Sequence, residues 1–473
     1  MTAPTDRAPD VGAEPESSFD RLLEAVAAHW CEEGVRLGAQ YAQAFVEATS
    51  HVRLDTAVRH GARAGHGTSL DRRFGVGLLL RRRDSWWYGS APLAEPGLLA
   101  ERVATLQGFG RPRAPEPISR CSELEEERPH RDLYLLTDSI TRSAAAADLS
   151  VDFVQDFFRG QRAVVDSTGA GRSWRSTGGR QRCAATAWGQ GQRARVFTRR
   201  NAPHWRLGDA GPDLALSAEN LILSAADRSR ALLGSRRLGV RTTPVVLAPR
   251  VGAALLHELI GHALEADNLA KASSYTGGLM GAALTSAPLR LVDDPGVPEG
   301  MGSCATDDDG QAATRVVLVD RGIVAGRLTC TRAVYGSSDL STGSGRREDY
   351  RHASLPRASN TVVLPGPDST AALLEPPRGG LLHVGALSSG EINLDRGEFS
   401  FAASESHFLT PAGDSIPLQD VVLFGDARDA LRQLAGIADD VEGDNATCGK
   451  QGQSVRIGLH SPTMRFDQLT WRC

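Results

Sequence analysis

The apolar residues of the N-terminal half change from a helical to an alternating pattern soon after the start. In residues 19–36 they recur at helical spacing, which predicts an amphipathic helix. Short alternating segments separated by polar or glycine-containing turns then predict strands at residues 41–48, 52–57, 75–80 and 85–88. A second group of strands is predicted at residues 151–158, 161–166, 182–188 and 194–198. With a helix expected at residues 214–233, this half is predicted to be an α+β domain assembled from two units.

Between the two predicted units lies a charged, proline-rich stretch. Residues 111–131 contain four prolines, and residues 123–127 form an acidic run. This composition is typical of a loop or linker rather than of a core element. We therefore divide the chain into a leader (1–18), an N-terminal domain (19–240) and a C-terminal domain (241–473).

The C-terminal domain is expected to be β-rich with one clear helix near its start. The helix is predicted at residues 250–267, where apolar residues dominate. Strands are predicted in the short alternating segments 314–320, 323–330, 361–364, 391–395, 399–407, 420–424 and 454–457. The fold class is thus α+β, with a helix lying on a β-rich scaffold.

Composition and charge exclude several classes of protein. The chain has 473 residues, and its 53 basic against 57 acidic residues create no strong field for nucleic acid or an anionic membrane. The most apolar stretch is not a membrane span, because prolines and charged residues such as Arg250 and Glu258 interrupt it. The leader lacks a secretory pattern, so we expect a disordered start of a cytoplasmic protein. Seven scattered cysteines without a CxxC pair do not predict a disulfide scaffold.

The apolar helix carries the residues with the clearest chemistry. His257 is followed at once by Glu258, and a second histidine, His262, comes five positions after the first. In the commoner zincin motif the histidines are four residues apart, about 40° around an α-helix, and both reach one ion. Five residues of regular helix would separate them by about 140°. A single π-type turn would return them to one face, and Gly261 offers a flexible point for it, so we predict a local distortion of this helix.

The motif alone leaves an alternative open. Both histidines could be hydrogen-bonded core groups, with Glu258 a solvated or capping residue. A glutamate between two histidines on an apolar helix needs compensation for its burial, which favours a metal site. The sequence then adds a resemblance over a much longer stretch.

The C-terminal half resembles the TldD/PmbA metallopeptidases, specifically their metal-bearing TldD-type subunit. The matching text includes PVVLAPRVGAALLHELIGHALEAD (244–267), TGSGRREDYRHASLPRASNT (342–361), GEINLDRGEFSFAASESHF (390–408) and TCGKQGQSVRIGLHSPTMRFDQLT (447–470). In the first half only GAQYAQAFVEATSHVRLDTA (38–57) is similar. The resemblance implies a Zn²⁺ site formed by His257, His262 and Cys448, with Glu258 as the catalytic general base.

The resemblance also implies an activity and a partner. Two neutral imidazoles and a thiolate leave one zinc position for water, which is the pattern of a catalytic site. The expected function is hydrolysis of unfolded or flexible peptides by a heterodimer with a TldE/PmbA-like second subunit that lacks the motif. The alternatives are a TldD-like subunit acting on a modified peptide or specialised-metabolite conjugate, and a noncatalytic scaffold with a vestigial metal site.

Other candidate sites are weaker. The pairs and runs Asp293-Asp294 and Asp307-Asp308-Asp309 lack the spacing of a calcium loop, so we interpret them as solvated turns. The Gly-rich segment 343–347 is expected at the substrate cleft, with Arg346 or Arg347 holding a peptide carboxylate. The residues 404–407 include two serines and a histidine but no GxSxG elbow, which argues against a serine hydrolase. The strand-like segment 398–406 could instead pair with an extended substrate backbone.

Overall fold

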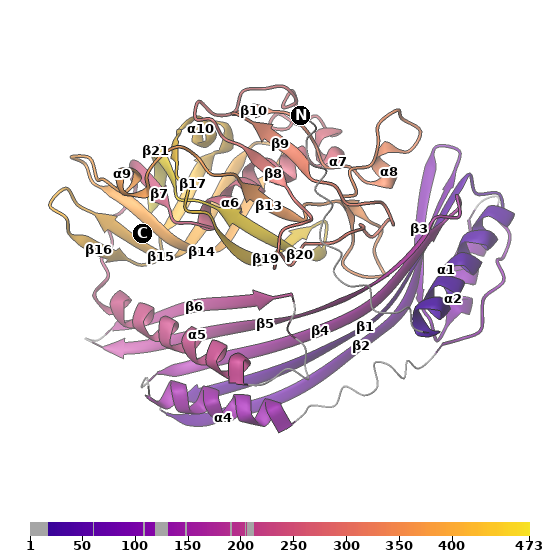
Figure 1. Cartoon of the computed structure of the whole chain (residues 1–473), viewed down its shortest axis with the longest axis horizontal. Helices are drawn as coiled ribbons and strands as arrows, with labels where there is room; N and C mark the ends of the chain where they lie inside the picture. The colour runs from indigo at the N-terminus through magenta and orange to yellow at the C-terminus, as the bar shows by residue number, and fades with distance from the viewer. Residues whose placement is uncertain are drawn as a thin grey trace, which may run out of the picture.

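The computed structural model describes residues 18–59, 61–106, 109–118, 131–146, 149–189, 192–203, 205 and 212–473. The predicted leader therefore lies outside the described residues, apart from Ser18 at the start of the first helix. Figure 1 shows two layers: a long, curved sheet formed by the N-terminal half, and a C-terminal half that lies over the concave side of that sheet.

The N-terminal half contains two units that share one antiparallel sheet of order β3-β2-β1-β4-β5-β6. In each unit, three strands lie between helices along the chain. The first unit comprises α1 (Ser18–Arg36), β1 (Tyr41–Arg59), β2 (Ala62–Arg82), β3 (Ser85–Pro92) and α2 (Pro96–Ala104). The second comprises α4 (Arg131–Ala146), β4 (Ser150–Asp166), β5 (Gly171–Gly189), β6 (Gln192–Ala202) and α5 (Pro212–Ala231), with a short 3₁₀ turn η2 (Leu232–Gly234) after it. The prediction of two α+β units is confirmed.

The strands are longer than the sequence pattern predicts. The segments 41–48 and 52–57 are one strand, β1, and the segments 151–158 and 161–166 are one strand, β4. Polar positions in their middle do not form turns, because they pair across the sheet: Ser50, only 2% exposed, lies opposite Arg159. The two strands pair continuously from Gln43 to Val58.

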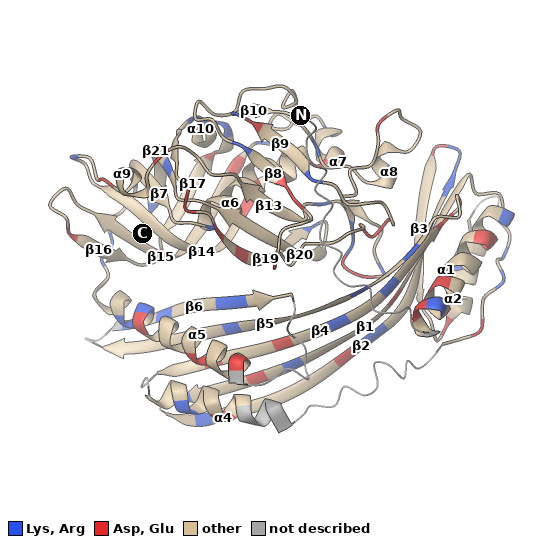
Figure 2. Ribbon diagram, viewed as in Figure 1, with Lys and Arg blue, Asp and Glu red and all other residues tan. Residues whose placement is uncertain are grey.

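Alternate residues of β1 show which face of this sheet is covered by helices and which face is turned toward the C-terminal half. Ala44 and Val46 pack in a cluster with α1 and α2, while Val52 and Leu54 pack in a second cluster with α4 and α5. All four side chains point to the same side of the pleat, so the described helices cover that face. The opposite face, which includes Phe45, is turned toward the C-terminal half. Both signs of charge occur along the strands of this sheet (Figure 2).

The C-terminal half has two larger sheets and a small one, with a large apolar core and a smaller apolar cluster that includes Cys448. The first sheet, of order β10-β9-β8-β13-β20-β19, contains β8 (Leu291–Asp293), β9 (Val316–Asp320), β10 (Ile323–Val324), β13 (Asn360–Val363), β19 (Glu442–Lys450) and β20 (Gln453–Ser461). The second contains β7 (Arg241–Leu247), β14 (Leu381–Asn393), β15 (Glu398–Leu409), β16 (Ser415–Leu418), β17 (Val422–Asp426), β18 (Leu434–Ile437) and β21 (Met464–Arg472). The small sheet pairs β11 (Gly345–Arg346) with β12 (Leu355–Pro356).

Short helices connect these strands. They are α6 (Val251–Leu256), α7 (Ala266–Leu269), α8 (Thr331–Val334), α9 (Thr370–Leu373) and α10 (Ala427–Arg432). The β-rich domain is confirmed, and the strand expected at residues 323–330 spans only Ile323–Val324. Several of its strands were not predicted, namely β7, β8, β11, β12, β16, β18, β19 and β21. The missed strand β19 is polar and lies at a sheet edge, so it lacks the apolar alternation of a half-buried strand.

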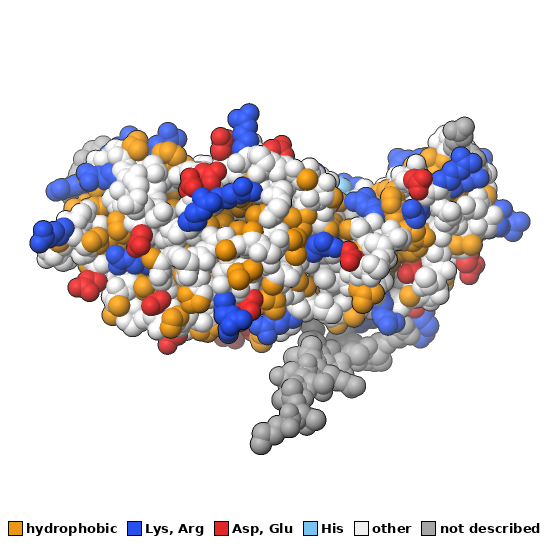
Figure 3. Space-filling view, turned by 90° about the horizontal axis from the view of Figure 1, so that it is seen from above, with side chains coloured by type: hydrophobic (Ala, Val, Ile, Leu, Met, Phe, Trp, Pro, Cys, Tyr) orange, Lys and Arg blue, Asp and Glu red, His pale blue; other side chains and the backbone are white. Residues whose placement is uncertain are grey.

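Several exclusions made from composition can be compared with the structure. Among the described residues, no helix is long and apolar enough to cross a membrane. The six cysteines within the described ranges are all free. On the face drawn in Figure 3, acidic and basic side chains are interspersed. The absence of a nucleic-acid partner stays a prediction.

Candidate metal centre

The helix that carries the histidines is distorted at the predicted place. After α6, residues His257–Gly261 form a π turn, and His262–Leu264 continue as a 3₁₀ turn before α7. The N–H of His262 donates to the carbonyl oxygen of His257, five residues earlier. This wider turn places both imidazoles on one side of the helix, as predicted.

Gly261 is not the special flexible point that the sequence analysis expected. Its φ of −53° and ψ of −57° are ordinary right-handed helical values. A Cβ built there would lie 3.6 Å from Nδ1 of His257, which is a normal contact. Glycine is therefore not required for the π turn by either backbone conformation or space.

Two imidazoles and a thiol converge beside this turn. The ligand atoms of His257, His262 and Cys448 all lie within 4.8 Å of one another, and the three side chains are buried. The Sγ atom of Cys448 is 3.2 Å from Nε2 of His262, and the two imidazole centroids are 4.8 Å apart. Cys448 comes from β19, which packs its apolar side against α6. Within the described residues, this is the one group of three or more such side chains.

Hydrogen bonds on the far side of each ring direct the Nε2 atoms inward. Nδ1 of His257 lies 2.8 Å from Oγ1 of Thr361 on β13, and Nδ1 of His262 lies 3.0 Å from Oε2 of Glu265. Nε2 of His257 is buried and has no hydrogen-bond partner among the described residues. An orphaned imidazole nitrogen facing a thiol is the arrangement expected of a metal ligand, and outer contacts of this kind orient metal-binding histidines.

Glu265 is fully buried and favours its charged form. Burial on its own would raise the pKa of this carboxyl, but the charges of His262 and Lys450 outweigh burial and lower the pKa to about 2. Nζ of Lys450 lies 2.8 Å from Oε2 of Glu265 and 2.6 Å from Oδ1 of Asp267. A fixed carboxylate behind His262 keeps the Nδ1–H of that ring in place and raises its basicity as a ligand.

The thiol of Cys448 favours its charged form. Burial acts to raise its pKa, yet the neighbouring His257 and His262 hold the pKa well below the usual range of a thiol. The thiolate is the form that binds metal. Two imidazole nitrogens and a thiolate sulfur match three ligands of a tetrahedral zinc ion, so the residues present fit this metal.

Glu258 lies at the edge of the same group. Its side chain is 24% exposed, more than the ligand side chains, and its Oε2 is 3.9 Å from Nε2 of His262. Burial raises the pKa of this carboxyl, while the charges of His257 and His262 oppose the rise. A carboxylate with a raised pKa that faces both the ligand group and solvent is suited to exchange protons.

Two of the other predicted sites are corrected by the structure. Asp307, Asp308 and Asp309 do form a turn, but all are buried: Asp307 accepts from the N–H groups of Asp309, Gln311 and Gly345. Asp293 is also buried, on β8. These aspartates are structural acceptors rather than solvated turn residues.

The arginine expected to hold a substrate is used inside the protein. Nη2 of Arg347 lies 3.1 Å from Oδ1 of Asp309, and its guanidinium stacks 4.3 Å from the ring centroid of Phe45 on the N-terminal sheet. With both charges only 1–2% exposed, Arg347 is not free for a peptide carboxylate. Arg346 donates to the carbonyl oxygen of Ala358, and a contact of Arg346 with substrate stays a prediction.

Sequence reasoning missed four residues that support the centre: Thr361, Glu265, Lys450 and Arg357. Glu265, three residues after His262, and Lys450, two after Cys448, had a usable signal because both stand next to predicted ligands. Thr361 and Arg357 are 104 and 91 residues away from the ligands that they contact. No local pattern identifies them.

Known proteins match the half of the chain that carries this centre. Residues 240–472 match the family model described as PmbA/TldA metallopeptidase C-terminal domain. A metalloprotease TldD homolog of Haemophilus influenzae is 32% identical over 229 residues, which cover 48% of this chain and 47% of that protein. A zinc metalloprotease TldD homolog of Saccharolobus solfataricus is 29% identical over 227 residues, covering 48% and 50%. The chain thus spans about half the length of the curated relatives it matches.

A solved structure extends the likeness to the whole fold. TldE from Thermococcus kodakarensis superimposes with a TM-score of 0.69 at 15% identity, covering 97% of this chain and 100% of that one. The matched metallopeptidase C-terminal domain, residues 240–472, is the β-rich domain that carries the π-distorted HExxxH helix and the nearby cysteine. The chain belongs to the TldD/PmbA family of metallopeptidases.

Proposed function

We propose that this chain is the catalytic subunit of a zinc-dependent peptidase. The observation that carries the proposal is the buried group of His257, His262 and Cys448 with Glu258 beside it. The name of the S. solfataricus relative, a zinc metalloprotease, supports the choice of metal. A cytoplasmic location stays a prediction from the sequence.

The residues divide the work of hydrolysis among them. His257, His262 and Cys448 would hold a zinc ion, which would act as a Lewis acid that lowers the pKa of bound water toward ~7 and polarises the peptide carbonyl. Glu258 accepts the proton of the attacking water and passes it to the leaving amine. Glu265 and Thr361 hold the two imidazoles in the orientation that the ligands need.

The segment 398–406, which was predicted to pair with the substrate, does not fit that role, and another strand fits it better. The segment 398–406 belongs to β15, which pairs with β14 along one side and with β16 and β17 along the other. It therefore has no free edge. The strand that carries Cys448 is different, since β19 pairs with β20 and ends the order of its sheet within the described residues. Asn201 of β6 donates to the carbonyl oxygen of Asn445, so the part of β19 available for pairing lies nearer Cys448.

We infer that an extended peptide adds to the outer edge of β19. Main-chain pairing there would place the substrate backbone next to Cys448, and it would require a flexible chain rather than a folded one. Affinity would come mainly from backbone hydrogen bonds, with modest dependence on side chains. The proposed substrates are accordingly unfolded or flexible peptides.

The proposed partner is a TldE/PmbA-like second subunit. The fold shared with TldE of T. kodakarensis supports this, because two chains of one fold can assemble around a common cleft. Light scattering of the chain alone and mixed with such a subunit tests the heterodimer. A stable monomer that cleaves peptides unaided would contradict it.

Two alternatives differ in what they predict for the purified complex. A subunit that processes a modified peptide or specialised-metabolite conjugate would cleave that conjugate but not a general peptide library. A scaffold with a vestigial site would cleave neither, and Glu258 in its present position argues against this reading.

The deciding experiment follows hydrolysis of an unstructured peptide library by the complex. We expect cleavage that stops on chelation and returns with about one zinc ion per chain. Cleavage that survives complete metal removal would refute the proposed function.

A further inference from the structure

One arginine contacts the candidate metal centre directly, although neither the motif nor the proposed mechanism assigns it a role. Arg357 lies between β12 and β13 and its side chain is fully buried. Its Nη2 is 3.0 Å from Sγ of Cys448 and 2.7 Å from the carbonyl oxygen of the same residue. Its Nη1 donates to the carbonyl oxygen of Gln453 at 3.4 Å.

The buried guanidinium of Arg357 has no carboxylate partner among the described residues. Within the described residues, no ion pair joins this guanidinium to an Asp or Glu side chain, and its Nε has no hydrogen-bond partner. Burying an unpaired cation is costly, so such a group needs a nearby negative charge. The Sγ atom of Cys448 lies 3.0 Å from this guanidinium, and a cysteine binds metal as its negatively charged thiolate. Charge-assisted hydrogen bonds of this kind are strong.

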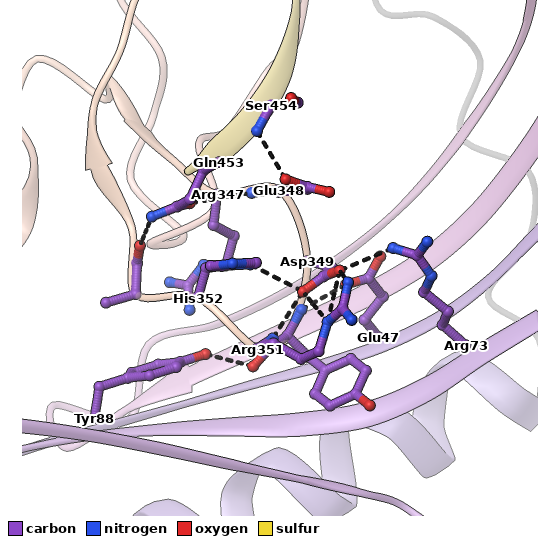
Figure 4. Close-up of polar contacts among 12 residues, drawn as sticks. Glu47, Arg73, Tyr88, Arg347, Glu348, Asp349, Arg351, His352, Gln453 and Ser454 are labelled. Carbon is purple, nitrogen blue, oxygen red and sulfur yellow. Dashed lines mark hydrogen bonds and ion pairs between the residues drawn. The ribbon is translucent and has the colours of Figure 1, made fainter. Parts of the chain in front are cut away.

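The chain that leads to Arg357 is fixed to the N-terminal sheet. Figure 4 shows Asp349 at the centre of these contacts: Nη1 of Arg73 on β2 lies 2.9 Å from its Oδ2. The N–H of Tyr350 donates to Glu47 on β1 at 2.8 Å, and the hydroxyl of Tyr88 on β3 donates to the carbonyl oxygen of Tyr350 at 2.6 Å. One end of the segment is thus tied to three strands of the other half.

The same segment is also tied, at Glu348 and Ala353, to the hairpin that carries Cys448. Nε2 of Gln453 on β20 donates to the carbonyl oxygen of Ala353 at 3.1 Å, and the N–H of Ser454 donates to Glu348 at 2.8 Å (Figure 4). Gln453 is paired with Lys450 at the turn of β19 and β20. The segment that precedes Arg357 therefore bridges the N-terminal sheet and the ligand hairpin.

We propose that Arg357 is a positioning residue of the metal centre, which fixes the sulfur of Cys448 and balances its charge. This inference rests on the proposed function, since it takes Cys448 to be a metal ligand. Arg357 acts through Cys448 and not on the substrate. Hydrogen bonds to a thiolate ligand orient it and reduce the charge that it gives to the metal, so they set both metal affinity and electronic structure.

The planar fork of the guanidinium explains why arginine is used here. It reaches the sulfur and two carbonyl oxygens at once, whereas the single ammonium group of lysine would keep the charge but lose this arrangement. Arg357→Met removes charge and fork at similar length, and Arg357→Lys removes only the fork. Arg351→Met is the matched control, because Arg351 lies in the same segment, is half-exposed and pairs with Asp349 rather than with a ligand.

The test measures zinc affinity by chelator competition and the sulfur-to-cobalt charge-transfer band of the Co²⁺-loaded chain. We expect Arg357→Met to bind zinc about 10- to 100-fold more weakly, Arg357→Lys to lie between it and wild type, and both to shift the band. Arg351→Met should change neither. A structural role alone would lower the unfolding temperature without moving the band.

If only one of Arg357→Met and Arg357→Lys folds, that variant alone tests the role of Arg357. A folded variant with wild-type zinc affinity and an unmoved cobalt band would overturn the inference while leaving the proposed function intact. A wild-type chain that binds neither metal would overturn both.

Discussion

The N–H of His262 donates to the carbonyl oxygen of His257, and this one π-type bond decides whether the two imidazoles can share an ion. In a regular α-helix the same two residues would point about 140° apart. The ring centroids are instead 4.8 Å apart, with Cys448 beside them. The extra residue of the HExxxH spacing and the wider turn compensate each other.

The first prediction concerns Gly261, which ends the π turn. Its backbone is already helical and a Cβ would meet only normal contacts. Gly261→Ala should therefore keep the full zinc content and stabilise the chain by about 0.5–1 kcal/mol, since alanine loses less backbone entropy on folding. Metal analysis and urea unfolding check this. Loss of zinc would mean that the turn needs a glycine after all.

The second prediction is that the three ligands act as one site. His257→Ala, His262→Ala and Cys448→Ala should each greatly lower a zinc content of about one ion per chain. The matched control is Cys330→Ala, which removes another buried, free thiol that lies outside the ligand group. Full occupancy in any of the ligand variants, measured by metal analysis after dialysis, would remove the proposed site.

The third prediction separates Glu258 from the ligands. Glu258→Gln keeps the size of the side chain but cannot accept a proton. We expect unchanged zinc content and a loss of hydrolysis of about 10²- to 10⁴-fold, which is typical when a general base is removed. Wild-type turnover in this variant would assign the proton transfer to another group.

The sequence was sufficient where chemistry is concentrated in a short motif. His257, Glu258 and His262 could be found from their residue types and spacing, and the same spacing required the π turn that the structure contains. Cys448 needed the family resemblance, because its strand is 186 residues from His262 and has no metal-binding pattern of its own.

The parts that sequence did not predict depend on long-range contacts. Ser50 was predicted to lie in a turn between two strands, but the strand continues through it because partners on both sides satisfy its backbone. Asp307 looked like a solvated turn residue, but Gly345 donates to it across 38 residues. Polar residues whose partners lie far along the chain carry no local signal of burial.

The fourth prediction tests the pairing of substrate with β19. If the peptide adds as a strand, its backbone N–H groups contribute to binding at every second residue. A flexible substrate methylated on alternate nitrogens facing the edge should lose at least about tenfold in kcat/KM, by the loss of one to two hydrogen bonds. The control peptide carries the methyl groups on the intervening nitrogens.

Equal loss for the two methylation patterns, or equal cleavage of a folded protein containing the same sequence, would exclude binding at a strand edge. Alanine substitutions in the peptide provide a further comparison. They should change kcat/KM less than methylation of the edge-facing nitrogens does, since backbone contacts carry most of the affinity.

The last prediction concerns the stability of the N-terminal sheet and its dependence on pH. Asp156 on β4 is almost completely buried, with His51 and Arg180 each 3.0 Å from its carboxyl oxygens and Arg182 at 3.2 Å. Burial acts to raise the pKa of this carboxyl, but these three partners outweigh it and lower the pKa from 3.8 to about 2. A lowered pKa means that the folded state holds the charged form more strongly than the unfolded state does.

The stabilisation by Asp156 is therefore fully present above the unfolded pKa of 3.8 and disappears as pH falls through about 2. This lowering of the pKa contributes roughly 2–3 kcal/mol to the free energy of unfolding at neutral pH. Asp156→Asn should destabilise the chain by about this amount at pH 7, and the difference from wild type should shrink steadily below pH 4. Urea unfolding at pH 7, 4 and 2.5 measures it, with the exposed Asp55→Asn as control. A deficit of equal size at all three pH values would show that lost packing, not lost charge, is responsible.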